Sequence, residues 1–413
     1  MINTTELLRA YAEMAPIEEV YQLIRALPGW PGVQVQDVFC KEVIRSQYTA
    51  VHPPSRRWLR SLLKRVEKDV QEGGEDGFSD LLAEVFIEQH LVAIDVAERT
   101  EFQDESYITF LPRDDDASAT NSTNKNNDRA ATATTLRVLR LHNDVGTRIW
   151  EAGLYLAEIL HCVPELLAGK AVVELGAGSG VTTLLAVKNC CTSERARHLP
   201  IRAVLTDHMP AVLENLLINV ELNATAERPR QPQDAAKRTF IYRHIGTGAE
   251  SGAATQCLMS VQPLDFATAT YSQCGRFAAD VILVADCTYS EEIIIHLVPA
   301  IEKFLCRDVD IVPAGGGSSS SSSSRSGSTT VGDGCSRSPL DAADGRPMCL
   351  LAATIRNPPT YEYLMTLLRA STRIVHEDVT AWAAEVAGPQ LYRYECRDSI
   401  RILALRAVAE YDS

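Results

Sequence analysis

The sequence has no long apolar segment. No run of about 18 apolar residues, the length that spans a bilayer, occurs in its 413 residues. The first residues, MINTTELLRAYAEM, also lack the positively charged stretch and apolar stretch that mark a secretory signal. We therefore expect a cytoplasmic protein without a membrane partner.

Cysteine spacings typical of metal sites or disulfide frameworks are missing as well. The 11 cysteines are odd in number and widely scattered, and no two form a C-x-x-C pair. The one doublet, Cys190-Cys191, is too cramped for an ordinary disulfide. This pattern predicts reduced, buried thiols and no metal.

Basic charge is in short supply. The chain has 40 basic and 54 acidic residues, a net charge of −14. Nucleic-acid backbones require a basic surface, so the composition argues against a direct nucleic-acid partner. A basic protein substrate or a small molecule suits this charge better.

The composition predicts a helical domain followed by an α/β domain. Segments such as IEEVYQLIRAL and WLRSLLKRVEKDV carry apolar residues at helical spacing, whereas strand-like and helix-like runs alternate later in the chain. This later order predicts a Rossmann-like, doubly wound parallel sheet with antiparallel strands at its C-terminal end. The expected parts are a helical domain at 1–105, a linker at 106–135 with a disordered insertion at 114–135, and the α/β domain at 136–413, interrupted by insertions at 224–238, 246–255 and 313–346.

Within the α/β domain, apolar runs and turn residues set the expected elements. VLRLHN, from residue 138, is expected to open the domain as a strand. The other expected strands are 171–175, 201–206, either 239–245 or 257–263, 280–285, 349–355, one near 372–380, and 400–406; the expected helices are 151–161, 180–190, 209–222, 290–306 and 359–370.

A glycine-rich turn follows the first buried strand, in the sequence AVVELGAGSG. Gly176, Gly178 and Gly180 allow close backbone approach to a ligand, and the helix that follows offers free N–H groups and positive potential. Dinucleotide sites favour G-x-G-x-x-G, but Val181 stands where they place Gly or Ala. Together with Glu174 inside the strand, the turn indicates a nucleoside-like ligand. A glycine turn without a ligand is the structural alternative.

Three acidic residues are expected at the same edge of the sheet, after successive strands. Asp207 is placed to bind ribose hydroxyls, although an Asp there can also cap the next helix. Asp265 follows the third strand beside Phe266, which taken alone is a core residue. Asp286 ends the fourth strand, where the reaction centre of such sheets lies.

The order of these segments resembles the class I, seven-β-strand protein-lysine methyltransferases, and among them the elongation factor 2 lysine methyltransferases. The matching segments are HPPS in the helical region, IWEAGLYLAE, VVELGAGSGVT, LTDHMPAVLENLLINVELN, PLDF, FAADVILVADCTYSEEII and TIRNPP. The resemblance implies S-adenosylmethionine as cofactor and a lysine of elongation factor 2 as acceptor.

The resemblance also implies a role for each site residue. Asp286 and Tyr289 would face the incoming lysine, and Asp286 would accept a hydrogen bond from its amine. Two positions depart from the family pattern: Glu151 stands in place of Asp, and Phe266 in place of Trp. The implied cofactor-binding residues are Trp150, Glu174, Gly176, Ala177, Gly178, Gly180, Asp207, Asp265, Phe266 and Ala285.

The segment RNPPT admits two interpretations. N-P-P followed by an aromatic marks methyltransferases that act on nucleobase or glutamine amines, but here the motif follows a later strand and Thr360 intervenes. We favour a helix start, with Asn357 as cap and prolines in the first turn. A substrate-side role for Arg356 and Asn357 stays open.

Three functions fit the sequence. The first is a monomeric protein-lysine methyltransferase acting on elongation factor 2. The second is a methyltransferase of the same fold acting on another protein, a small molecule or RNA. The third is a non-catalytic interaction protein that retains the cofactor fold, against which the intact glycine motif and acidic residues argue.

Overall fold

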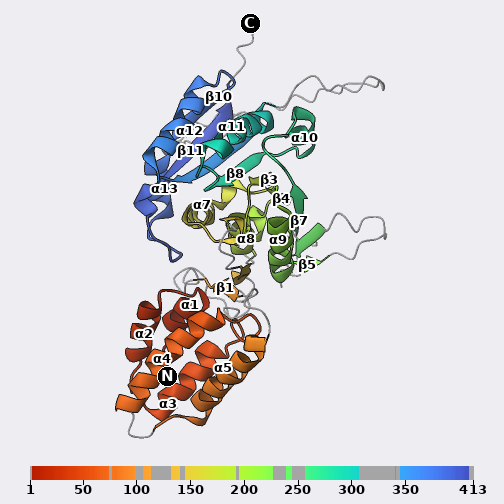
Figure 1. Ribbon diagram of the computed structural model, residues 1–413. Helices are drawn as coiled ribbons and strands as arrows, with labels where there is room; N and C mark the ends of the chain where they lie inside the picture. Colours follow the sequence, from red (N-terminus) through yellow and green to blue (C-terminus); the bar gives the residue numbers. More distant parts are fainter. Residues whose placement is uncertain are drawn as a thin grey trace, which may run out of the picture.

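The chain forms a helical part and an α/β part, with a small two-stranded sheet between them (Figure 1). The expected insertions at 114–135, 224–238, 246–255 and 313–346 lie wholly or largely outside the described residues. The computed structural model describes residues 2–73, 77–98, 106–112, 132–139, 145–191, 195–226, 239–243, 256–306, 340 and 345–408.

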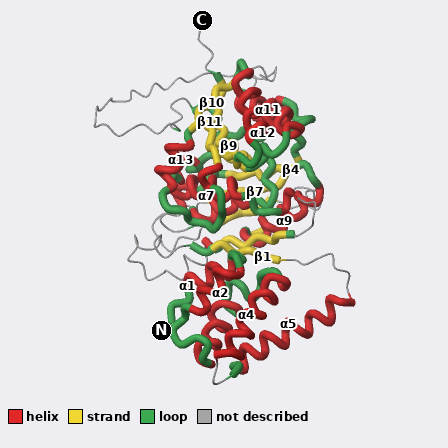
Figure 2. The backbone as a smooth tube through the Cα atoms, turned by 60° about the vertical axis from the view of Figure 1, so that its left-hand side comes forward, coloured by secondary structure: helices red, strands yellow, loops and turns green. Residues whose placement is uncertain are grey.

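The N-terminal part is a helical bundle, as the sequence predicted. Its core contains Tyr11, Phe39 and Leu62, all almost completely buried. Figure 2 shows these helices packed together below the small sheet. Its helices are α1 (Thr5–Ala12), α2 (Ile17–Arg25), α3 (Val33–Val38), the π-helix η1 (Phe39–Ile44), α4 (Arg56–Gly73) and α5 (Asp80–Glu98).

The small sheet corrects the expected linker at 106–135. β1 (Ser106–Phe110) pairs antiparallel with β2 (Thr134–Val138), so both ends of that range are strands. The strand expected from residue 138 onward instead ends there. A pairing between segments more than 20 residues apart gives no local signal, because each strand is only five residues long.

Asparagines of α9 (Pro210–Asn223) attach this sheet to the α/β part. The side-chain oxygens of Asn219 and Asn223 accept from the backbone N–H groups of Arg137 (2.7 Å) and Thr135 (2.9 Å). These two asparagines are 0% and 9% exposed. They pair with backbone N–H groups at the edge of β2, as a neighbouring strand would.

The main sheet confirms the Rossmann-like class I fold. Its strand order is β10-β11-β9-β8-β3-β4-β7-β6-β5, in which β11 runs antiparallel to both neighbours and β3, β4, β7, β8 and β9 are parallel. Both alternatives for the third strand are strands: β7 pairs parallel with β4, and β6 adds antiparallel to its outer edge. The strands are β3 (Ala171–Leu175), β4 (Arg202–Asp207), β5 (Thr225–Ala226), β6 (Thr239–Arg243), β7 (Gln256–Pro263), β8 (Val281–Ala285), β9 (Met348–Thr354), β10 (Ile374–Asp378) and β11 (Ile400–Ala407).

Helices cover both faces of this sheet, and each face has its own core. In β3, Val172 packs toward α7, α8, α9 and α13, whereas Val173 packs toward α10, α11 and α12. The carboxyl ends of the parallel strands therefore meet at one edge between the two layers. The further helices are α7 (Glu151–Cys162), α8 (Val181–Asn189), α10 (Tyr271–Arg276), α11 (Glu291–Leu305), α12 (Pro358–Ala370) and α13 (Thr380–Ala387), with 3-10 turns η3 (Val145–Thr147), η4 (Pro164–Leu166), η5 (Ala196–His198) and η7 (Arg397–Ser399).

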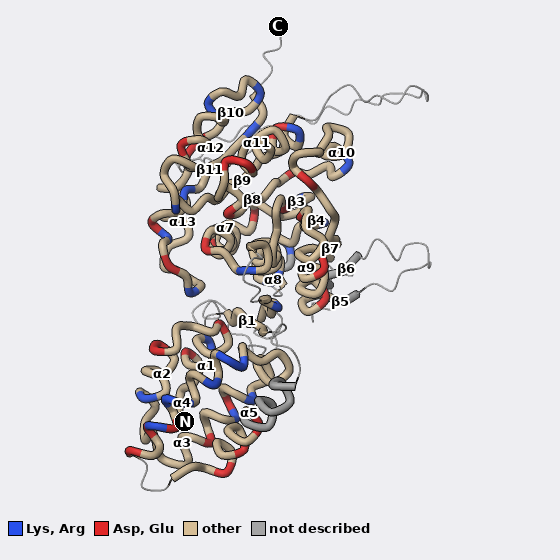
Figure 3. The backbone as a smooth tube through the Cα atoms, viewed as in Figure 1, with Lys and Arg blue, Asp and Glu red and all other residues tan. Residues whose placement is uncertain are grey.

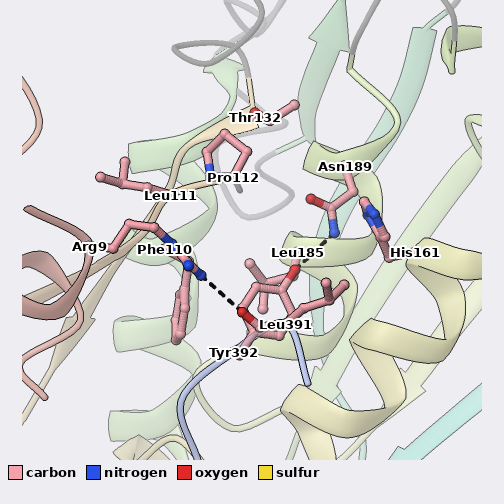
Figure 4. Close-up of a pocket in the computed structure, with 10 residues that line it drawn as sticks. All are labelled: Arg9, Phe110, Leu111, Pro112, Thr132, His161, Leu185, Asn189, Leu391 and Tyr392. Carbon is pink, nitrogen blue, oxygen red and sulfur yellow. Dashed lines mark hydrogen bonds between the residues drawn. The ribbon is translucent and has the colours of Figure 1, made fainter. Parts of the chain in front are cut away.

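A strap formed by residues 391–394 connects the two parts. Glu158 of α7 accepts from the backbone N–H groups of Leu391 (2.7 Å) and Tyr392 (2.9 Å), which fixes the strap to the α/β part. From the helical part, Arg9 donates to the carbonyl of Leu391 at 2.9 Å, beside Phe110 of β1 (Figure 4). A small cavity of about 20 Å³ lies among these residues.

Charged residues of both signs are interspersed over both parts (Figure 3). In the described part of the chain, no helix is long and apolar enough to cross a membrane.

Candidate functional site

The glycine turn adopts a backbone that requires glycine. Gly176, Gly178 and Gly180 have φ angles of 62°, 55° and 79°, in the left-handed region. A Cβ on Gly176 would lie 2.5 Å from the sulfur of Cys287, and one on Gly178 would lie 2.8 Å from the carbonyl oxygen of Gly146. The turn is thus fixed in shape, and α8 begins directly after it at Val181.

Glu174 braces this turn from within. Its side chain is buried, and its Oε2 accepts from the backbone N–H of Thr183 at 3.3 Å in the first turn of α8. Burial raises the pKa of Glu174 to about 7, against hydrogen bonds from Thr183 and Thr182 that lower it. The carboxylate therefore ties β3 to α8.

Asp207 stands at the carboxyl end of β4 and reaches the same turn. Its Oδ2 accepts from Gly178 N–H at 3.3 Å, and its Oδ1 accepts from the N–H groups of His208 (2.8 Å) and Met209 (3.1 Å). A carboxylate has about four lone-pair sites, so about one stays available to a ligand hydroxyl. Asp207 can therefore hold the following loop and still bind a ligand. The N-cap of α9 is Met209 and not Asp207.

The PLDF segment lies next to the turn. Phe266 is half-buried, and its ring atom Cζ is 3.5 Å from the position of a Cβ on Gly176. Asp265 is exposed, and its Oδ1 accepts from Ala267 N–H at 2.9 Å. The structure therefore brings this aromatic ring and the glycine turn together.

Trp150 precedes α7 at the same edge of the sheet. Its indole N–H donates to the carbonyl of Val145 at 2.8 Å, which fixes the ring. The guanidinium of Arg356 lies over this ring, 4.8 Å from the ring centre. Close packing brings α7 to the end of β8, since a Cβ on Gly153 would lie 3.9 Å from the Cβ of Ala285.

Asp286 follows β8 in a strained backbone conformation with a φ of 52° and 7% exposure. Its carboxylate accepts from Ala152 N–H (3.2 Å), Thr354 N–H (3.0 Å) and the Thr354 hydroxyl (3.1 Å). Both terminal nitrogens of Arg356 also donate to it, each at 3.2 Å. Five donors fill a carboxylate's roughly four lone-pair sites, so a lysine amine would have to displace one of them.

The neighbours of Asp286 differ in exposure. Tyr289 is 53% exposed at the surface of the site. Cys287 is buried, and burial raises the pKa of its thiol well above the ordinary range. A thiol that stays protonated is a poor nucleophile, so Cys287 supplies no nucleophile here.

The sequence left a substrate-side role open for Arg356, but it did not reveal the contacts that this residue makes. It follows β9 and binds both Asp286 and Glu151, which are 70 and 205 residues away along the chain. The helix start interpretation of the adjacent prolines is confirmed, because Asn357 is the N-cap of α12 and Pro358 opens its first turn. The Asn357 amide donates to the Thr360 hydroxyl at 3.0 Å and makes no side-chain cap bond.

The donors and acceptors at this edge fit S-adenosylmethionine. The glycine turn and the start of α8 present backbone N–H groups suited to a carboxylate, and Asp207 has acceptor capacity for hydroxyls. Phe266 and Trp150 supply flat apolar surfaces. Among the described residues, no group of three or more His, Cys, Asp or Glu side chains could hold a metal ion.

Comparisons with known proteins find similarity to lysine methyltransferases. Residues 134–234 match the sequence-family profile described as "Lysine methyltransferase". The chain is 26% identical over 296 residues to the mouse "Protein-lysine N-methyltransferase EEF2KMT", covering 68% of this chain and 73% of the mouse protein. It is 25% identical over 302 residues to the "Protein-lysine N-methyltransferase EFM3" of Chaetomium thermophilum, covering 71% of this chain and 77% of the relative.

Similarity to solved structures is weak. An O-methyltransferase from Bacillus cereus gives a TM-score of 0.29 at 12% identity, covering 65% of this chain and 86% of that one. The fold assignment therefore rests on the strand order and not on this match. The profile and the relatives make this chain similar to lysine methyltransferases, and together with the strand order they support a class I, S-adenosylmethionine-dependent protein-lysine methyltransferase.

Proposed function

We propose that this protein transfers a methyl group from S-adenosylmethionine to a lysine of elongation factor 2, acting as a monomer in the cytosol. The observation that carries the proposal is the similarity to relatives named "Protein-lysine N-methyltransferase EEF2KMT" over about two thirds of the chain, 68% for the mouse protein. The glycine turn after β3, Asp207 at the end of β4 and Asp286 after β8 support it, because they follow neighbouring parallel strands.

On the cofactor side, each residue has a proposed contact. The glycine turn, from Gly176 to Gly180 and including Ala177, would receive the methionine part, with Glu174 holding the turn in shape. Asp207 would bind the ribose hydroxyls, and Asp265 with Phe266 would hold the adenine. Trp150 would pack beside the cofactor, and Ala285 would lie under it.

On the acceptor side, the amine of the acceptor lysine must be neutral. The bound cofactor supplies a methyl group activated by its sulfonium sulfur. The lysine nitrogen attacks with its lone pair, so the ammonium has to lose its proton first, and alignment then dominates the rate. Tyr289, which is 53% exposed, would flank the side chain of the acceptor lysine, and Asp286 would hold the surface that the lysine amine contacts.

The alternatives fit less well. An acceptor in RNA is disfavoured by the net charge of −14 and by the position of N-P-P at the start of α12. A non-catalytic role would leave no need for the constrained glycine turn together with the strained Asp286.

The test is direct methylation. Purified protein is incubated with labelled S-adenosylmethionine and a lysate that lacks the endogenous activity, and in parallel with purified elongation factor 2. The expected result is label on a lysine of elongation factor 2, located by mass spectrometry, and none with Asp286→Ala. Label in nucleic acid or in another protein alone, or no label, would refute the proposed acceptor.

A further inference from the structure

The Arg356 guanidinium lies between two carboxylates from distant segments. It forms a two-pronged pair with Asp286, each contact 3.2 Å, and its Nη2 also binds the carboxylate of Glu151. The Trp150 ring covers one face of it. This one cation thus joins three segments: the end of β9, the turn after β8 and the start of α7.

The formal charge of this cluster is negative. Two carboxylates and one guanidinium leave one net negative charge beside the place where the acceptor amine would arrive. Burial works against the charge of Arg356, but its hydrogen bonds and ion pairs with Asp286 and Glu151 outweigh burial and raise its pKa. Arg356 is therefore positively charged at every working pH.

The other ionisable groups near the cluster are the same in every variant compared below. Burial raises the pKa of both Cys287 and Tyr289, so these neighbours are neutral near pH 7. Asp207 contributes a negative charge from the end of β4, where Gly178, His208 and Met209 already donate to it. Asp286, Glu151 and Arg356 thus carry the charge that an acceptor amine meets first.

We propose that Arg356 favours the neutral form of the acceptor lysine by offsetting the negative charge of Asp286 and Glu151, while holding the Asp286 carboxylate in place. It is a positioning residue, and the proposal rests on the proposed lysine methylation. With Arg356 present, an entering ammonium meets one net negative charge. Without Arg356 it would meet two, which would bind the ammonium more firmly and keep its lone pair protonated.

Two charge-changing variants should move the pH dependence in opposite directions. Arg356→Gln should shift the acid limb of the pH profile of kcat to higher pH by about one unit. At a given pH on that limb, kcat should fall about tenfold, and it should recover at high pH. KM for the acceptor should stay unchanged or fall. Glu151→Gln removes one negative charge, so it should shift the same limb to lower pH and raise KM.

Arg356→Lys is the matched control for charge. It keeps the positive charge but not the two-pronged geometry. Its acid limb should therefore stay near that of the wild type even where its turnover falls. Shifts in the same direction for Arg356→Gln and Glu151→Gln would indicate simple disruption and overturn the proposal.

A binding measurement gives a second readout that needs no turnover. Calorimetry of an acceptor peptide, in the presence of S-adenosylhomocysteine and in buffers of different ionisation enthalpy, counts the protons released on binding. The wild type should release a larger fraction of a proton than Arg356→Gln at the same pH. Equal release, or higher activity of Arg356→Gln at neutral pH, would mean that the guanidinium merely occupies the acceptor's place, and would overturn this proposal alone. A wild type that methylates no lysine would overturn the proposed function itself.

Discussion

Arg393 of the strap donates to the buried carboxylate of Glu13 in the helical part, with Nη1 and Oε2 2.9 Å apart. Glu13 has a side-chain exposure of 2%, and it also faces Arg9 at 3.5 Å. Arg393 binds Glu19 and Glu6 as well. Because the strap is fixed to Glu158, this network couples the helical part to the helix that begins beside Trp150.

Arg393→Ala should lower the free energy of unfolding by about 3 kcal/mol, since it removes one partner from a buried carboxylate. Chemical denaturation of the full chain measures this loss. Arg65→Ala is the control: Arg65 pairs with Glu18 at the surface, where both side chains are largely exposed, so it should cost less than about 1 kcal/mol. Equal effects of the two variants would show that the strap contributes no more than a surface ion pair.

The sequence was sufficient to predict the strands of the sheet but not the side-chain contacts between residues that follow different strands. The predicted strand at 171–175 agrees with β3, because a run of buried apolar residues followed by glycines has few alternatives. The contact between Arg356 and Asp286 had no such signal, since it depends on β9 lying beside β8. The asparagines of α9 did leave a signal, because Asn215, Asn219 and Asn223 recur every four residues on a face that turned out to be buried.

Gly178→Ala should weaken binding of S-adenosylhomocysteine at least tenfold, as measured by calorimetry. The added Cβ would meet the Gly146 carbonyl at 2.8 Å, and alanine disfavours the φ of 55° by about 1–2 kcal/mol. Gly169→Ala isolates the backbone cost, because Gly169 has a φ of 65° but nothing within 4 Å of the added Cβ. Gly169→Ala should therefore lose stability without losing ligand affinity. Similar affinity losses in both would contradict a specific role for the turn.

Glu174→Gln should change how stability depends on pH. The pKa of Glu174 rises from 4.5 to about 7 on folding because of burial, so the folded state holds a proton that the unfolded state releases across this range. Wild-type stability should thus fall as pH rises from about 4.5 to 7, and the fall attributable to Glu174 should reach about 3 kcal/mol above pH 7.

The comparison of Glu174→Gln with the wild type isolates this group, since other buried carboxylates are common to both proteins. Denaturation curves at pH 4, 5.5 and 7.5 should show the variant gaining stability relative to the wild type at each step. Parallel pH curves for the two proteins would show that Glu174 is ionised to the same extent in the folded and unfolded states.

Substitution of Asp286 separates its charge from its backbone conformation. Asp286→Ala removes the acceptor of five hydrogen bonds and places alanine at a φ of 52°, so turnover should fall by more than about a hundredfold. Affinity for S-adenosylhomocysteine should change by less than about tenfold, because none of the donors to Asp286 belongs to the glycine turn.

Asp286→Asn is the sharper variant, since asparagine adopts the left-handed region readily and keeps one oxygen acceptor for Thr354. If charge is what matters, Asp286→Asn should lose nearly as much turnover as Asp286→Ala while unfolding at a temperature closer to that of the wild type. An active Asp286→Asn variant would instead assign Asp286 to holding the turn, and loss of ligand affinity equal to the loss of turnover would place it on the cofactor side of the site.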